Sequence, residues 1–222
     1  TIVAEALDEI CEALEKDKAA KKDFNESVQA LLQKIIKKHK RVIFNGDNYT
    51  EAWVKEAEKR GLPNLKTTPE ALDVVTKPKI KKLFAKHGVL TEKELHSRYE
   101  VYLEAYDTII DYEARLTADM AKTLIVPAAL AYQEELADTI QSVASVSKLK
   151  NPSARKLLDV MVKTTESVMT KIHKLELAMG RGDSLKTKAA MDALREDVDV
   201  LEGVVPTHLW PLPSYAEMLF LL

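Results

Sequence analysis

Residues 90–127 read "LTEKELHSRYEVYLEAYDTIIDYEARLTADMAKTLIVP", and this stretch predicts the element around which the chain is organised. Thr91 and Glu94 have the spacing of a capping box, in which each side chain accepts a hydrogen bond from the other residue's backbone N–H. Behind them, apolar residues recur at helical spacing as far as Pro127: Leu95, Tyr99, Leu103, Tyr106, Ile110 and Leu124. The stretch therefore predicts a helix that begins at Glu92 and runs for about 50 Å.

Pro127 interrupts this pattern without ending it. Proline has no backbone N–H and its ring pushes against the preceding turn, yet helical spacing resumes beyond it to about Leu149. We therefore expect a kink at Pro127 rather than a stop. "NPSAR" (151–155) starts a further helix that ends at Gly180, and another runs from about Leu185 to Leu201.

These long segments and their short connections predict an antiparallel bundle. The tail that follows is punctuated by prolines, and we expect it to be extended until Ser214 and Glu217 form a second capping box over a short last helix. The predicted fold class is all-α, a long antiparallel helical bundle with a smaller, mainly helical N-terminal segment. The expected division is 1–90 for that segment and 91–222 for the bundle with its proline-rich tail.

The N-terminal segment begins with two amphipathic helices, predicted from Thr1 to about Asp17 and from Phe24 to His39. The stretch "RVIFNGDNYTEAW" (41–53) then interrupts the helical pattern. Its first residues favour extended backbone and "NGD" tolerates positive φ, so an extended run and a turn are expected.

Two further helices are predicted before residue 90. The first has Thr50 as its cap, Tyr49 packed on Val54 as a hydrophobic staple, and Gly61 at its end. The second has Thr68 as its cap and continues to Lys86 or His87.

The composition favours no nucleic-acid or membrane partner. The chain has 33 Lys and Arg against 35 Asp and Glu, so no net field favours nucleic acid or an anionic membrane surface. The longest apolar run at the end, "EMLFLL", is too short to span a bilayer. Cys11 is alone and cannot form an internal disulfide. We expect a cytoplasmic protein, and the threonine start within a helical pattern suggests a piece of a longer chain.

An acidic stripe on the long helix is the strongest candidate for a metal site. Glu100, Glu104, Asp107 and Asp111 recur at helical spacing, as a di-metal bundle site requires. Such sites normally use Glu-x-x-His, but none of the five histidines has an acidic residue three positions before it. The sequence therefore favours a solvated stripe over a carboxylate metal bundle.

Other short motifs have simpler structural explanations. The basic run "KIIKKHKR" (34–41) is read as a solvated face, and "RGD" (181–183) as a loop that ends one helix and starts the next. Cys11 and His39 could act as nucleophile and base, but a lone cysteine on an apolar face is expected to pack as a small hydrophobe. Phosphate loops, dinucleotide fingerprints, zinc spacings and nucleophile elbows are missing from the sequence. We predict no catalytic, cofactor-binding or metal-ligating residue.

Long strings of this sequence resemble the C-terminal region of the type III glutamine synthetases, the large-subunit bacterial class. "KKHKRVIFNGDNYTEAWVKEAEKRGLPNLKTTPEAL" (37–72) and residues 83–133 resemble consecutive parts of that region, and "WPLPSYAEMLF" (210–220) resembles its end. "TIVAEAL" (1–7) resembles the helix that closes the catalytic domain. The resemblance covers nearly the whole chain and is least distinctive at 147–200.

The resemblance implies a parent enzyme in which ATP phosphorylates the γ-carboxylate of glutamate and ammonia displaces the phosphate, with Mg or Mn as the divalent metal. The family's catalytic motifs lie upstream of this sequence, so none is carried over to a residue here. The resemblance thus implies an inactive scaffold and assembly element. Its expected partners are the catalytic domain of its own chain and neighbouring subunits of a homo-oligomer.

Two questions stay open at this point. The segment 41–49 would either dock the helical region on the catalytic body, with Tyr49 and Trp53 as apolar anchors, or pack only on its own bundle. The chain would also fit a free-standing helical interaction module. The first helix discriminates between these functions, because its apolar face is poorly covered if it belongs to a catalytic fold.

Overall fold

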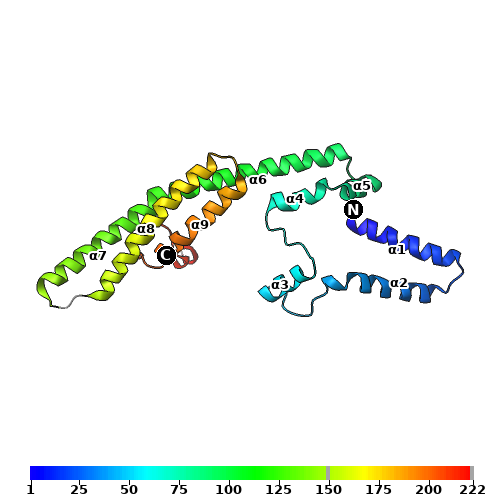
Figure 1. Ribbon diagram of the computed structural model, residues 1–222, viewed down its shortest axis with the longest axis horizontal. Coiled ribbons are helices and arrows are strands. Elements are labelled where there is room, and N and C mark those ends of the chain that lie inside the picture. Colours follow the sequence, from blue (N-terminus) through cyan, green and yellow to red (C-terminus); the bar gives the residue numbers. More distant parts are fainter. Residues whose placement is uncertain (149–150, 221–222) are drawn as a thin grey trace. The chain divides into compact units, whose positions relative to one another are not determined.

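The computed structural model describes residues 1–148 and 151–220, and this part of the chain is helical with no strand (Figure 1). The all-α fold class is therefore confirmed. In chain order the elements are α1 (Ile2–Ala19), α2 (Phe24–His39), the 3₁₀ turn η1 (Lys40–Val42), α3 (Glu51–Lys59), α4 (Thr68–Thr76), α5 (Pro78–Lys86), α6 (Glu92–Met120), the π-helical segment η2 (Ala121–Ile125), α7 (Val126–Val146), α8 (Pro152–Met179), α9 (Ser184–Glu202) and α10 (Tyr215–Leu219).

The chain forms two compact units, Thr1–Glu104 and Ala105–Leu222, and each is described by itself. The first contains α1 to α5 and the start of α6, and the second contains the rest. The division expected at residues 90 and 91 stays a prediction.

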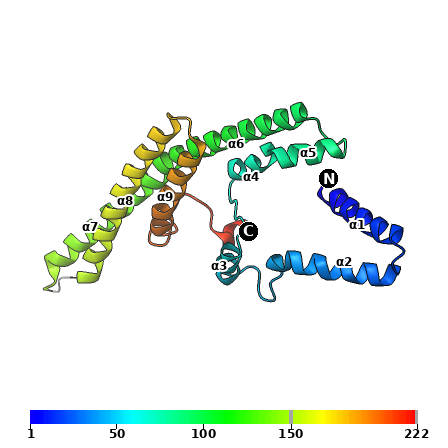
Figure 2. The same cartoon turned by 45° about the vertical axis from the view of Figure 1, so that its right-hand side comes forward.

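Helices α1 and α2 form an antiparallel hairpin (Figure 2); α2 has the bounds predicted from the sequence, and α1 runs two residues beyond its predicted end at Asp17. Asp23 caps α2, because its carboxylate accepts a hydrogen bond from the backbone N–H of Glu26 at 3.0 Å. No residue of α1 is buried, and in α2 only Ser27 is. The hairpin therefore has little core of its own.

The stretch 41–53 differs from the prediction in two ways. Lys40–Val42 continues as a 3₁₀ turn, and the backbone becomes extended only at Ile43, so the β-like run is wrong for its first half. The staple of Tyr49 on Val54 is also wrong, since Tyr49 is 100% exposed. The cause is local, because the carboxylate of Asp47 accepts from the Tyr49 N–H at 2.9 Å and fixes a turn there. Thr50 is the N-cap of α3 in position, although its hydroxyl donates to the Asp47 carbonyl instead.

The helix expected from Thr68 to Lys86 or His87 is broken into α4 and α5. Pro78 is the reason, because a residue before proline is pushed out of the helical region, and Lys77 has φ −65° and ψ 138°. The cap also lies one residue earlier than predicted. Thr67 forms a capping box with Glu70, whose carboxylate accepts from the Thr67 N–H at 3.1 Å and its hydroxyl at 2.9 Å.

The capping box at the start of α6 is confirmed. The Glu94 carboxylate accepts from the Thr91 N–H at 2.8 Å, and the Thr91 hydroxyl accepts from the Glu94 N–H at 3.3 Å. Leu95, one residue further, is only 5% exposed. The predicted start at Glu92 thus has a bonded cap and a buried apolar residue in its first turn.

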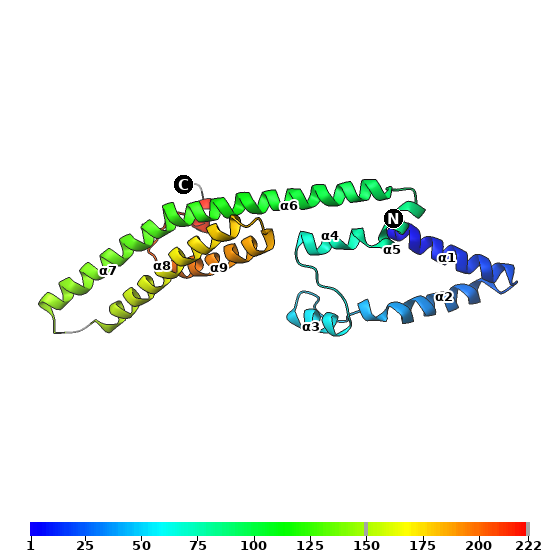
Figure 3. The ribbon, with the colours of Figure 1, turned by 45° about the horizontal axis from the view of Figure 1, so that its top comes forward.

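The long helix does not stop at Pro127, as predicted. Helix α6 passes through η2 into α7, and Pro127 is the second residue of α7 (Figure 3). The π-helical segment directly before it provides the departure from α-helical geometry that a proline without an N–H requires. Helix α7 ends at Val146, and the predicted end at Leu149 lies outside the described residues.

In the second unit, α7, α8 and α9 pack side by side around the core, as Figures 1 and 3 agree. The expected bundle is therefore confirmed within residues 105–222. Small residues line one side of the core, where they let helices approach closely, and larger side chains from α8 and α9 fill the other side. The buried set is Ala114, Ala118, Ala121, Ile125, Ala129, Leu136, Met161, Val168, Ile172, Leu175, Leu194, Leu201 and Val205.

Polar contacts fix the register of α8 against its neighbours. The hydroxyl of Thr165, 2% exposed, donates to the Met161 carbonyl at 2.7 Å and accepts from the Gln133 amide of α7 at 2.8 Å. On the other side, Lys171 lies 2.8 Å from the Asp197 carboxylate of α9. Burial alone would raise the pKa of Asp197, but its hydrogen bonds with Lys171 and Ser167 outweigh that effect and lower the pKa.

Leu175 tests the core of the bundle. Leu175→Ala should lower the free energy of unfolding by about 2–5 kcal/mol, because it leaves a cavity at a fully buried site. Leu177→Ala is the matched control on the same helix, since Leu177 is 51% exposed, and should change stability by less than about 0.5 kcal/mol. Urea denaturation measures both. Equal losses for the two variants would contradict the described packing.

Thr91 tests the start of α6. Thr91→Ala removes the acceptor of the Glu94 N–H and leaves that group without its capping partner, so amide exchange in the first turn of α6 should accelerate roughly fivefold. Thr117→Ala is the control, because the Thr117 hydroxyl donates to the Glu113 carbonyl inside the same helix and caps nothing. Hydrogen exchange with mass spectrometry reads out residues 92–96. Unchanged exchange there would show that the box does not hold this end.

Candidate functional site

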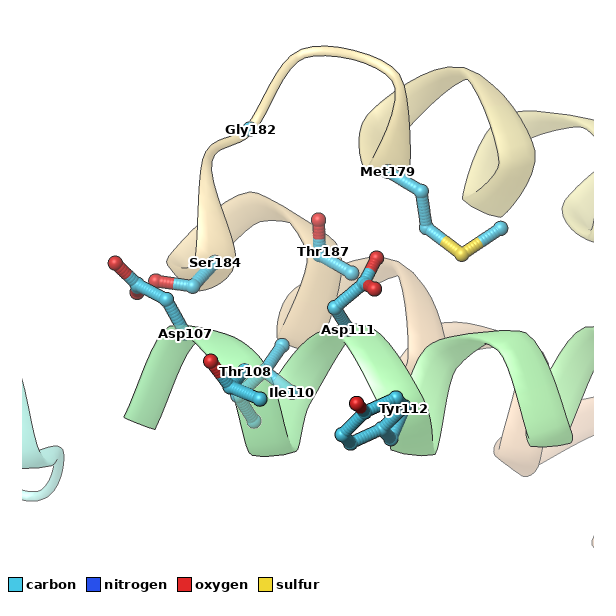
Figure 4. A pocket seen from close by; sticks show the side chains of 9 residues that line it. All are labelled: Asp107, Thr108, Ile110, Asp111, Tyr112, Met179, Gly182, Ser184 and Thr187. Carbon is cyan, nitrogen blue, oxygen red and sulfur yellow. The ribbon is translucent and has the colours of Figure 1, made fainter. Parts of the chain in front are cut away.

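Two members of the acidic stripe line a cavity of about 330 Å³ in the second unit. Figure 4 shows Asp107 and Asp111 on α6 opposite Ser184 and Thr187 of α9. The cavity is thus rich in oxygen atoms. Asp111 already has a cation, because Arg115 Nε lies 2.9 Å from its carboxylate.

The stripe as a whole does not assemble a metal site. Its four carboxylates project from a single helix, and Glu100 lies 3.5 Å from His96 on that helix. Among residues 1–148 and 151–220, no three of the stripe's carboxylates bring their oxygens within 4.8 Å of one another. Four carboxylates that do not converge cannot hold a di-metal centre, so this arrangement gives no support to the metal-bundle hypothesis.

The other sequence motifs take structural positions. Gly182 in "RGD" has φ 66° and turns the chain between α8 and α9. Asp183 caps α9 by accepting from the Lys186 N–H at 3.0 Å, so its carboxylate is already occupied. Cys11 is exposed, which corrects the expectation that it packs as a small hydrophobe. Lys34, Lys38 and His39 line a shallow cavity of about 230 Å³ between α1 and α2, and Cys11 is not part of its lining.

The connector, defined as residues 41–60, is held together by its own side chains. Trp53 stacks on Phe44 with ring centroids 4.7 Å apart, and the Arg60 guanidinium lies 5.6 Å from the Trp53 ring. Arg60 Nη1 also donates to the carbonyls of Ile43 at 2.8 Å and Arg41 at 3.2 Å. Sequence reasoning missed Arg60, whose position two turns after Trp53 on one helix was the available signal. Tyr49 has no comparable contact with the connector and is fully exposed.

Several exposed apolar residues of the first unit lie on the α1–α2 hairpin. Val3 and Leu7 on α1 are 72% and 56% exposed, and Leu32 and Ile36 on α2 are 53% and 56% exposed. These four residues are called the hairpin face.

Helical geometry places the four residues on one side of the hairpin. Ala6 and Ile10 of α1 face α2, and Leu31 and Ile35 of α2 face α1. On α1, Val3 lies three residues before Ala6 and Leu7 directly follows it. On α2, Leu32 directly follows Leu31 and Ile36 directly follows Ile35. Since the two helices are antiparallel, the same rotation brings both pairs to the same side. Exposed apolar residues gathered on one side of a hairpin are a candidate interaction surface.

None of the described helices is long and apolar enough to cross a membrane.

Comparison with known proteins supplies the family. Residues 27–144 match the glutamine synthetase C-terminal domain. The chain is 32% identical to the type-3 glutamine synthetase of Dictyostelium discoideum, with 100% of this chain and 32% of the relative aligned. It is 34% identical to the glutamine synthetase of Butyrivibrio fibrisolvens over 89% of this chain and 30% of that protein. For the enzyme of Bacteroides fragilis the values are 28%, 88% and 29%.

The chain thus spans about a third of the length of these relatives. The match covers most of α2, the connector, α3 to α6 and most of α7, and it includes the strings at 37–72 and 83–133 that resemble the type III enzymes. On this evidence the chain belongs to the glutamine synthetase C-terminal domain family.

Proposed function

We propose that the chain is the helical scaffold of an enzyme that forms glutamine from glutamate and ammonia with ATP, and that it provides assembly surface rather than catalytic groups. Alignment with proteins named glutamine synthetase over most or all of the chain supports this proposal. In the whole enzyme, ATP and Mg or Mn would be held by residues outside this chain. We propose a cytoplasmic, homo-oligomeric enzyme.

The observation that carries the proposal is the hairpin face. Burying one Val, Leu or Ile side chain contributes about 1.5–3 kcal/mol, so four such residues exposed by half or more leave several kcal/mol unused. The face would contribute this energy when it packs on the catalytic part of the enzyme or on a neighbouring subunit. Helix α1, which has no buried residue, would gain stability from such a partner.

The connector offers one candidate docking anchor, not the two that the sequence suggested. Trp53 is already packed between Phe44 and Arg60, which favours a turn that is stable by itself. Tyr49, with its ring fully exposed, remains the candidate anchor for a contact with the catalytic body.

A free-standing interaction module is the second candidate function. It would use the same hairpin face for an unrelated partner. A self-sufficient module should cover its first helix, whereas α1 has Ile2, Val3 and Leu7 each more than half exposed. This exposure favours the scaffold of a larger enzyme.

The hairpin face can be tested in the full-length enzyme that carries this sequence. The double variant Leu7→Glu and Ile36→Glu should lose its oligomer and lower glutamine formation at least about tenfold, because two charges cannot be buried without a partner. The matched control is Leu7→Met with Ile36→Leu, which keeps the face apolar and should behave as wild type. Sedimentation and glutamine assays measure both. An assembled, fully active double-charge variant would remove the proposed role of the face.

Activity of the chain alone tests the absence of catalytic groups. Purified residues 1–222 should show no glutamate-dependent ATP hydrolysis above a blank with Mg or Mn, whereas the full-length enzyme should turn over. Coupled phosphate release is the measurement. Hydrogen exchange of residues 1–20 gives a second readout, since α1 should exchange faster in the chain alone than in the enzyme. ATP turnover by the chain itself would overturn the proposal.

A further inference from the structure

A cluster of metal-binding side chains lies where α1 meets the end of α5. Glu5 and Asp8 of α1 and His87 after α5 each offer one ligand atom, and these atoms all lie within 4.8 Å of one another. We propose that this cluster is a Zn²⁺ site that fastens α1 to α5. The inference rests on this geometry and not on the proposed function.

Backbone structure presents the three side chains together. Glu5 and Asp8 are three residues apart on one helix, so their carboxylates share a face. His87 is the C-cap of α5, and the chain turns away directly after it because Gly88 has φ 61°. The Gly88 and Val89 N–H groups donate to the Ala85 and Phe84 carbonyls, each at 3.1 Å, which fixes this turn.

The imidazole is already aimed at the carboxylates. His87 Nε2 lies 2.8 Å from Glu5 Oε2, and the His87 side chain is only 14% exposed. A ring held by burial on one edge and by a carboxylate on its nitrogen loses little freedom when it binds an ion. The site is therefore largely formed before any metal arrives.

The donor set selects the ion. One imidazole nitrogen and two carboxylate oxygens suit Zn²⁺, which takes such ligands at about 2.0–2.2 Å and accepts water in a fourth position. Mg²⁺ and Ca²⁺ prefer oxygen ligands throughout, so the imidazole disfavours them. Small rotations of the exposed carboxylate of Asp8 would close the present spacing to the shorter one around a zinc ion.

Lys86 now takes the place of a cation between the two carboxylates. Its ammonium lies 2.6 Å from Glu5 Oε2 and 3.2 Å from Asp8 Oδ2. This contact shows that the position stabilises positive charge. The Lys86 side chain is 44% exposed and flexible, so it can swing into solvent when an ion enters.

A metal at this position would hold α1 in place, which apolar packing does not do. No residue of α1 is buried, and the Lys86–Glu5 ion pair is an exposed contact, which stabilises little in water. A zinc ion that bridges α1 and the end of α5 would join segments about 80 positions apart in the sequence. The first helix would then be fixed by coordination.

Titration of metal-free protein with Zn²⁺ against a chelating dye tests the site. Wild type should bind one Zn²⁺, and His87→Gln should weaken binding at least about tenfold because a ligand is lost. Lys86→Met should strengthen binding about tenfold, since it removes the competing cation and keeps the length of the side chain. Millimolar Mg²⁺ or Ca²⁺ should not compete.

His96→Gln is the matched control. His96 also lies near a carboxylate, 3.5 Å from Glu100, but has no third donor, so this variant should bind Zn²⁺ like wild type. Circular dichroism verifies that each variant is folded, and Co²⁺ absorption of the folded wild-type protein reports the coordination geometry. Equal weakening in His87→Gln and His96→Gln, absence of stoichiometric binding, or no gain in Lys86→Met would each overturn the site.

Discussion

The second unit depends on one constraint, the continuous burial of a single stripe along α6, η2 and α7. The stripe runs through Ile110, Ala114, Ala118, Ala121, Ile125, Ala129, Tyr132, Leu136 and Ile140, all buried or packed on the core. Between Ile110 and Ile140 the stripe completes eight helical turns. Eight turns of regular α-helix need about 29 residues, which is one residue fewer than the distance in sequence from Ile110 to Ile140. The π-helical segment η2 takes up that additional residue. With η2 next to Pro127, the helix continues past the proline and its apolar face still points at α8 and α9.

The same constraint explains what could be predicted from the sequence. Caps and periodicity are local signals, so the starts of α2, α6 and α10 and the long path through Pro127 were predicted correctly. The errors arose where a second local signal competed with the first. The Asp47 carboxylate accepts from the Tyr49 N–H and fixes a turn in which Tyr49 is exposed. Thr67 rather than Thr68 forms the capping box with Glu70, and Pro78 ends α4 within an otherwise helical pattern.

Contacts between distant segments could not be obtained in this way. The carboxylate of Glu5 meets Lys86 and His87, and Arg60 bonds the carbonyls of Arg41 and Ile43 across the connector. No sequence spacing encodes those pairs, because each depends on how two helices are placed by the rest of the fold. The histidine rule that argued against metal ligands looked for an acidic residue three positions away on the same helix. That rule does not consider ligands supplied by another helix.

The two units differ in what stabilises them, and this difference bears on function. Within residues 1–104 only Ser27 and Leu95 are buried, whereas the second unit has a core that includes Met161, Leu175 and Leu194. The first unit relies on caps, ion pairs and the stacking of Trp53, interactions that water weakens. Amphipathic helices such as α1 and α2 gain stability mainly when their apolar side is covered. The matched relatives are about three times as long as this chain, and the scaffold role proposed above would cover this apolar surface with another part of such a protein.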